Sequence, residues 1–216
     1  MHGWSALILA GGAASRFGGG KLVADMAGAP VIRRVTEAVA AADFDELIVV
    51  TGAENARIRA ALCGMNVHII NAPDWAEGMA ASVRCGVAAL APETNGVCVF
   101  LGDMPLVPVA LCEMVTAAAL KAGYAARPRF EGKPGHPVAF TRAAYPDLMM
   151  LKGDQGANTL LRRRDGDVAY CDTDDSGALR DIDTREDLVA VTRAWKRCAT
   201  SATSESAISR GALPKP

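Results

Sequence analysis

Short apolar runs and segments of helical periodicity alternate along most of this chain. The first run, residues 5–10, is too short for a buried helix and ends at two glycines, as a buried strand does. Further strands are expected at 46–51, 67–70, 97–101 and 168–171, and helices at 30–42, 54–62, 77–90, 108–121, 142–151, 156–164 and 185–197. Strands that alternate with helices pair in parallel through right-handed crossovers. We therefore expect an α/β fold: a Rossmann-like, mostly parallel sheet with helices on both faces.

Two segments depart from this alternation. Residues 124–140 carry five prolines and glycines, which favours a small β excursion with a loop. Residues 199–216 are rich in Ser, Thr, Gly and Pro, so we expect a disordered tail. The length of 216 residues suits a single domain, which we place at 1–198.

Charge and composition exclude several classes of protein. The net charge is −1 and the basic residues are scattered, so we expect no nucleic-acid partner. The six cysteines form no Cys-x-x-Cys pair and are expected to be reduced thiols. No apolar run reaches the roughly 18 residues of a membrane span, and the N-terminus lacks the basic region of a secretion signal. We expect a cytoplasmic protein that binds no membrane.

The segment from Leu9 to Lys21 is rich in glycine and directly follows the first expected strand. Ligands of open α/β sheets bind at this carboxyl edge. Gly11 and Gly12 allow the backbone to approach a ligand with its N–H groups, and Arg16 and Lys21 can neutralise phosphate charge. A solvated surface loop is the alternative, but loops of this length are uncommon unless functional. The segment predicts a phosphate-binding loop.

Spacing excludes two familiar phosphate-binding motifs. A Walker A motif fails because Ser15 stands in place of its first glycine and Leu22 follows the lysine. A dinucleotide-binding motif fails at Val23, and the second strand ends in Thr51 where an acidic ribose ligand is needed.

Two groups of carboxylates are candidate ligands of Mg²⁺, which prefers hard oxygen ligands. Asp103 follows the apolar strand 97–101, at the same sheet edge as the loop; a role in capping the next helix is the alternative. Near the C-terminus, Asp183 is the preferred second ligand and Asp181 the next. Thr184 to Asp187 also fits a capping box, which would give this acidic segment a purely structural role.

The loop resembles the nucleotidyltransferase superfamily, whose signature Leu-x-Ala/Gly-Gly-x-x-x-Arg-x-Gly-x-x-Lys matches from Leu9 to Lys21. The resemblance implies that the loop wraps an NTP, that Arg16 and Lys21 steady the leaving pyrophosphate, and that the backbone near Ala10 holds the base. It also implies a metal-binding role for Asp103. The Asp-Ile-Asp-Thr-Arg-Glu-Asp segment resembles the ending of several cytidylyltransferases, which favours metal binding there.

Further motifs resemble the molybdenum cofactor cytidylyltransferases. These are Gly-His-Pro at 135–137, Gly-Asp-x-Gly-Ala at 153–157, and an Asn-Pro…Glu-Gly-Met…Ser-like segment at 71–86. The resemblance implies transfer of CMP from CTP to the phosphate of molybdopterin, and a molybdoenzyme or its chaperone as partner. The nucleotide site it implies consists of Leu9, Ala10, Gly11, Gly12, Arg16, Lys21, Asn71 and Ser82. The acceptor site it implies consists of Gly135, His136, Asp154 and Gly156.

The acceptor motifs also have a physical reading. His136 lies between Gly135 and Pro137, on what we expect to be a rigid, exposed turn where the imidazole can donate to an anionic acceptor; a structural histidine bonded within its own loop is the alternative. Gly156 opens a helix, and amides there can bind a phosphate, while Asp154 can act as an N-cap.

Two positions depart from the cytidylyltransferase pattern. Gly11 stands where these enzymes usually carry Ala and their guanylyltransferase relatives carry Gly, which leaves GTP as the alternative donor. Asn158 stands where the family commonly has Arg, which removes a fork suited to phosphate and leaves another phosphorylated acceptor open. A non-catalytic nucleotide-binding or cofactor-delivery module is the alternative from a different class.

Overall fold

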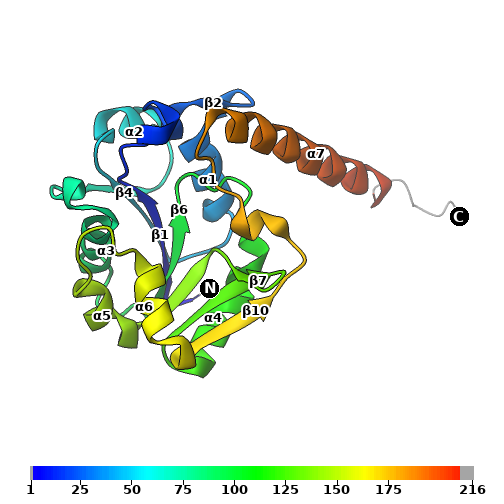
Figure 1. The fold of residues 1–216 in the computed structure, drawn as a ribbon. Coiled ribbons are helices and arrows are strands. Elements are labelled where there is room, and N and C mark those ends of the chain that lie inside the picture. Colours follow the sequence, from blue (N-terminus) through cyan, green and yellow to red (C-terminus); the bar gives the residue numbers. More distant parts are fainter. Residues whose placement is uncertain (1, 210–216) are drawn as a thin grey trace, which may run out of the picture.

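One mixed sheet forms the centre of the molecule. The computed structural model describes residues 2–209, and only the backbone for Ser15 and residues 199–209 (Figure 1). In spatial order the strands are β10 (Val168–Asp172), β7 (Ala125–Phe130), β9 (Val138–Thr141), β6 (Gly96–Leu101), β1 (Trp4–Ala10), β4 (Glu46–Thr51) and β5 (His68–Asn71). The two-residue strand β8 (Lys133–Pro134) pairs with β7.

One half of the sheet, from β6 through β1 and β4 to β5, is parallel, and the other half is mixed. β1 lies between β4 and β6 and pairs in parallel with both. The expected β excursion at 124–140 supplies β7 and β9, which enter the same sheet through antiparallel pairs. Because the parallel strands point the same way, the loops after β1 and β6 meet at one edge.

Helices cover both faces of the sheet, because each central strand buries alternate side chains on opposite sides. One face packs against α1 (Val31–Ala40), α2 (Asn55–Ala61) and α4 (Cys112–Ala122). The other packs against α3 (Met79–Ala88), α5 (Tyr145–Met149) and α6 (Ala157–Arg163), which lie together on one side in Figure 1. The fold is therefore the expected mixed α/β architecture. No helix among the described residues has the length and apolar character of a membrane span.

The structure differs from the expected elements in two places. A short hairpin, β2 (Asp25–Met26) and β3 (Ala29–Pro30), precedes α1 and carried no recognisable strand pattern. The last helix, α7 (Arg185–Ser209), extends past the expected end at 197, so the backbone of residues 199–209 is helical where we expected disorder. Residues 199–209 contain neither Gly nor Pro, so nothing in them stops a helix. The rest of the expected tail, 210–216, lies outside the described residues.

Candidate active site

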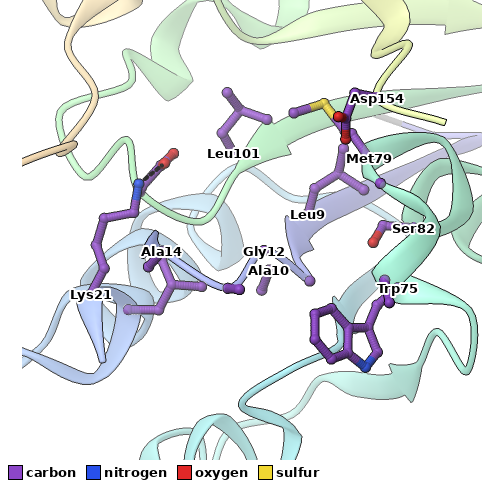
Figure 2. A pocket seen from close by; sticks show the side chains of 16 residues that line it. Leu9, Ala10, Gly12, Ala14, Lys21, Trp75, Met79, Ser82, Leu101 and Asp154 are labelled. Carbon is purple, nitrogen blue, oxygen red and sulfur yellow. Dashed lines mark hydrogen bonds and ion pairs between the residues drawn. The ribbon is translucent and has the colours of Figure 1, made fainter. Parts of the chain in front are cut away.

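A cavity of about 390 Å³ opens at the carboxyl edge of β1 and β6. The glycine-rich loop, the short helical turn η3 (Trp75–Glu77), the start of α3 and two aspartates form its walls (Figure 2). Six of the expected nucleotide-site residues line it: Leu9, Ala10, Gly11, Gly12, Lys21 and Ser82. The structure thus brings the loop together with Ser82 on α3, which is distant in the sequence.

The loop backbone is held in place at Gly11, and the amides of the residues that follow can bind a ligand. The Ala53 amide donates to the carbonyl of Gly11 at 3.4 Å, and Gly52 packs so closely that a Cβ there would overlap that carbonyl. Within the described part of the chain, the amides of Gly12, Ala13 and Ala14 donate to no acceptor. Unpaired, exposed amides of this kind are suited to bind phosphate oxygens.

The far end of the loop turns Lys21 towards the cavity. Gly20 adopts a left-handed conformation with a φ of 70°, which glycine tolerates at little cost. Its amide donates to Glu54 Oε1 at 3.0 Å, which ties the loop to the start of α2. The Lys21 side chain is then only 11% exposed, and its stem is held by the fold.

Asp103 binds Lys21 at one end of the cavity. The Gly102 amide donates to the carbonyl of Leu9 at 2.9 Å, so the turn after β6 lies beside the end of β1. Lys21 Nζ donates to Asp103 Oδ2 at 2.7 Å. No side chain caps α4, so Asp103 does not have the alternative capping role. Asp103 Oδ1 is buried and has no hydrogen-bond partner among the described residues, which leaves one carboxylate oxygen available to a ligand.

The C-terminal acidic segment reaches the same point. The Ile182 amide donates to the carbonyl of Asp103 at 3.0 Å, which places residues 181–183 beside the turn after β6. Asp183 accepts from Lys21 Nζ at 3.3 Å and from Arg16 Nη1 at 3.1 Å. Arg16 lies outside the cavity lining, with a side chain 80% exposed, and its one ion pair among the described residues is with Asp183.

The alternative capping role applies to Asp187 and not to Asp183. The amides of Asp183 and Thr184 both donate to Asp187 Oδ2, and the Asp187 amide donates to Thr184 Oγ1. These bonds form the predicted capping box at the start of α7. Because Asp187 satisfies the helix end, the Asp183 carboxylate remains directed to Arg16 and Lys21.

The charges in this cluster shift the pKa of its members. Burial alone would lower the pKa of Lys21, but the attraction of Asp103 and Asp183 outweighs it, so that the pKa is raised and the amine stays charged. Burial raises the pKa of Asp181, and repulsion from Asp103 and Asp183 adds to this rise. The surroundings of Asp181 therefore disfavour its charged form.

The donor set fits a divalent cation in its chemistry. Asp103 and Asp183 share one positive group, Lys21 Nζ, and the buried Asp103 Oδ1 lacks a partner. Among the described residues no cluster of three or more His, Cys, Asp or Glu side chains forms a ready metal site. Two carboxylates plus phosphate oxygens of a substrate are nevertheless the usual ligands of Mg²⁺, so the residues fit an ion that arrives with a nucleotide.

Four further residues of the expected site do not line the cavity: Asn71, Gly135, His136 and Gly156. Asn71 is exposed at the end of β5 and does not line the cavity. His136 does not lie on an exposed turn: it is partly buried, and its Nδ1 atom is buried without a partner among the described residues. Burial and the nearby Arg127 lower its pKa to about 4, so the imidazole is neutral near pH 7. Gly135 and Pro137 are buried beside it, because the turn folds back under Ala178.

One of the expected acceptor residues lines the other end of the cavity. Asp154 lines it, opposite Lys21 in Figure 2. Gly156 occupies the N-cap position of α6, and no side chain caps that helix, so Asp154 is not its N-cap. A Cβ at Gly156 would come within 2.7 Å of Met79 Sδ, which packs this segment against the start of α3.

Sequence reasoning missed several residues that line the cavity. Trp75, Met79 and Leu101 supply apolar surface, and Figure 2 shows the Trp75 ring across the cavity from Lys21. Their apolar side chains carry no charge or spacing signal that separates a cavity wall from a core. Only their place in segments 71–86 and 97–101, both already linked to function, gave a clue.

Comparison with known proteins agrees with this geometry. The family model for the MobA-like NTP transferase domain matches residues 6–168. The purine catabolism protein PucB of Bacillus subtilis is 29% identical over 87% of this chain and 95% of its own length. The molybdenum cofactor cytidylyltransferase of Escherichia coli is 27% identical over 57% of this chain and 62% of its own.

A solved structure has the same fold. The crystal structure of Rv0371c from Mycobacterium tuberculosis is 26% identical with a TM-score of 0.76, over 88% of this chain and 97% of that one. A structure of Rv0371c in complex with manganese is 24% identical with a TM-score of 0.72, over 88% and 98% of the two chains. With a family match over residues 6–168 and a glycine-rich loop that lines its cavity, the chain belongs to the MobA-like NTP transferase domain family of nucleotidyltransferases.

Proposed function

We propose that this chain transfers CMP from CTP to the phosphate of molybdopterin, with release of pyrophosphate. The observation that carries the proposal is the cluster at one end of the cavity, where Lys21 binds both Asp103 and Asp183 and Arg16 joins them. Cations and carboxylates that meet beside unpaired loop amides are suited to an NTP with its metal ion.

The reaction needs positioning and charge neutralisation and no covalent nucleophile. An oxygen of the acceptor phosphate attacks the α-phosphorus of the NTP in line. The new P–O bond forms as the bond from the α-phosphorus to the oxygen bridging it to the β-phosphorus breaks, and the electron pair leaves with pyrophosphate. Arg16 and Lys21 neutralise charge on the phosphates, and Asp103 would hold the metal ion.

Mg²⁺ is the metal we assign to this site. Asp103 and Asp183 would hold it, with Asp181 as the second choice for the C-terminal ligand. When bound, the ion neutralises negative charge on the phosphates of the nucleotide. The unpartnered Asp103 Oδ1 supports this assignment, as does the manganese complex of Rv0371c.

The acceptor is assigned to the end of the cavity opposite Lys21. Gly135, His136, Asp154 and Gly156 would form this side, while Asn71 and Ser82 would flank the nucleotide. The name of the Escherichia coli relative supports molybdopterin, whereas PucB is named for purine catabolism. Another phosphorylated small molecule is the alternative acceptor. A molybdoenzyme or its chaperone would receive the product in the cytoplasm.

Guanylyl transfer is the second candidate function, and one contact favours it. A Cβ at Gly11 would overlap the Oγ atom of Ser82, which is 5% exposed in the cavity wall. The alanine that cytidylyltransferases usually carry at this position therefore does not fit unless Ser82 moves. We assign the base to this part of the cavity wall, where Gly11 resembles the guanylyltransferase pattern.

Pyrophosphate release with each of the four NTPs, Mg²⁺ and molybdopterin tests the proposal. Release with CTP supports cytidylyl transfer, and release with GTP alone supports guanylyl transfer. A protein that binds an NTP, as seen by a rise in Tm, but releases no pyrophosphate with molybdopterin or other phosphorylated acceptors is a non-catalytic module.

A further inference from the structure

Arg127 on β7 is a buried cation whose hydrogen-bond partners are all neutral. The residue is 5% exposed. Its Nε and Nη2 atoms donate to the carbonyl of Gly135 at 3.1 and 3.0 Å, and Nη1 donates to Asn158 Oδ1 at 2.7 Å. Among the described residues no carboxylate lies within ion-pair distance of this guanidinium. Buried charges are costly unless paired, so this arrangement calls for an anion.

The neighbouring Arg129 shows the usual arrangement on the same strand. Its Nε and Nη2 atoms donate to the two oxygens of Asp172 at 2.8 and 3.1 Å. Arg129 is the more exposed of the two arginines and has less need of a counter-charge. β7 therefore pairs its exposed arginine with a carboxylate and leaves its buried arginine without one.

The groups around Arg127 do not neutralise it. Burial lowers the pKa of Arg127, as expected for a cation without a counter-charge. The phenol of Tyr170 is nearby, but its pKa is raised by its hydrogen bond to Asp165, so it is uncharged near pH 7. Burial and the charge of Arg127 keep His136 neutral. The cluster thus carries one net positive charge.

Hydrogen-bonding capacity at this cluster is left for a ligand. A guanidinium has five N–H groups, and Arg127 uses three of them. Asn158 accepts through Oδ1, so its Nδ2 group points its two donors elsewhere, and the residue is exposed.

The chain links the cluster to the end of the cavity opposite Lys21. Asn158 lies in the first turn of α6, four residues after Asp154, which lines the cavity. The preceding residues pack directly against the cavity wall: Ala80 donates to the carbonyl of Gly153 at 3.1 Å, and Gly156 lies against Met79. One short segment, residues 153–158, therefore joins the cavity wall to the Arg127 cluster.

We infer that Arg127 and Asn158 form an anion site that binds a phosphate-like group of the acceptor. The free N–H groups of the guanidinium and the Asn158 amide supply the donors, and the ligand supplies the missing negative charge. The identification of this ligand as the acceptor rests on the proposed function. The anion site itself rests only on the contacts of Arg127.

Inorganic phosphate is the probe, and Asn158→Asp is the decisive variant. This substitution gives the Arg127 guanidinium a carboxylate partner from the protein itself. The ligand-free protein should therefore gain stability, while phosphate loses its site. We expect isothermal titration at constant ionic strength to show at least about tenfold weaker phosphate binding than in the wild type. Phosphate bound at the glycine-rich loop contributes to both proteins and cancels in the comparison.

A purely structural Arg127 predicts a different result. In that case Asn158→Asp raises Tm and leaves phosphate affinity unchanged, which overturns the inference; so does a wild type that binds no phosphate. If Asn158→Asp fails to fold, Arg127→Lys takes its place, since it keeps the charge and loses the fork. Arg129→Lys is the matched control on the same strand: weaker binding in Arg127→Lys alone supports the site, and equal affinity in both overturns it.

Failure of this inference differs from failure of the proposed function. NTP binding, followed by Tm, depends on the Lys21 end of the cavity and is measured on the same proteins. A wild type that binds phosphate through Arg127 but binds no NTP keeps the anion site and refutes the transferase proposal. A wild type that binds and turns over an NTP, with phosphate affinity unaffected by Asn158→Asp, keeps the transferase proposal and refutes the anion site.

Discussion

The Lys21 end of the candidate active site and the Arg127 cluster, termed the Arg127 end, hold positive charge in opposite ways. At one end Lys21 binds two carboxylates, Asp103 and Asp183, and its pKa is raised. At the other end the described partners of Arg127 are a carbonyl and an amide oxygen, and its pKa is lowered by burial. Both side chains are largely buried, so solvent does not account for the difference.

The difference separates the ligands that each end is suited to bind. A lysine already neutralised by two carboxylates leaves no net attraction for a bare anion, and the carboxylates favour a phosphate that brings its own metal ion. An arginine without a counter-charge favours a metal-free anion. In the proposed reaction these are the NTP with Mg²⁺ and the phosphorylated acceptor.

Loss of the carboxylate at the Lys21 end should have the largest effect. Asp103→Asn keeps the size of the side chain and removes the charge that would hold the metal ion, so we expect turnover to fall by roughly 10³-fold. Steady-state pyrophosphate release measures this. Asp174→Asn, at an exposed position, is the control. If Asp103→Asn keeps wild-type turnover, the metal assignment at this end is wrong.

The pH dependence of stability tests the charge at the Arg127 end. The pKa of His136 is about 4 in the folded protein and about 6.5 when unfolded, so the unfolded chain binds the extra proton first. Stability is therefore present above pH 6.5 and is lost as the pH falls towards 4, by at most about 3 kcal/mol.

Urea unfolding of the wild type and His136→Gln between pH 7 and 4 measures this contribution. The difference between the two proteins removes the titration of carboxylates that both share. Parallel curves, with a constant difference over the whole range, would mean that His136 titrates normally and that its environment is not positive.

Removal of the cation at the Lys21 end should weaken NTP binding. Lys21→Met keeps the stem and loses the charge, and we expect about a hundredfold loss of affinity for the NTP with Mg²⁺. Lys133→Met on β8, at an exposed position, is the control for the loss of one charge. Equal affinities for the NTP in the two variants would remove Lys21 from the nucleotide site.

The two arginines of β7 give the smallest effect and the cleanest contrast in stability. Arg127→Met leaves the carbonyl of Gly135 and the amide of Asn158 without their donor, and we expect a loss of roughly 2 kcal/mol in the free energy of unfolding. Arg129→Met removes an exposed ion pair and should change little. Chemical denaturation compares them; a loss no larger than that of Arg129→Met would show that the buried charge costs as much as its bonds contribute.

Local pattern in the sequence determined much of the fold and part of the site. The apolar run before Gly11 and the run before Gly102 specify buried strands, and two glycine-punctuated loops must follow them at one sheet edge. Lys21 and Asp103 could be chosen on this ground, because strand order in a parallel sheet brings such loops together. The Thr184–Asp187 capping box could also be predicted, since its bonds span only three residues.

Only the tertiary structure determined which partner each charged side chain has. Asp183 meets Lys21 because the Ile182 amide binds the carbonyl of Asp103, a contact across 79 positions that no local pattern encodes. His136 is partly buried and neutral, not exposed, because its turn packs under Ala178 and beside Arg127. Residue type and spacing determine hydrogen bonds within a turn or a helix. Burial and distant pairing depend on the packed sheet, and these fix which charges are neutralised and which remain for a ligand.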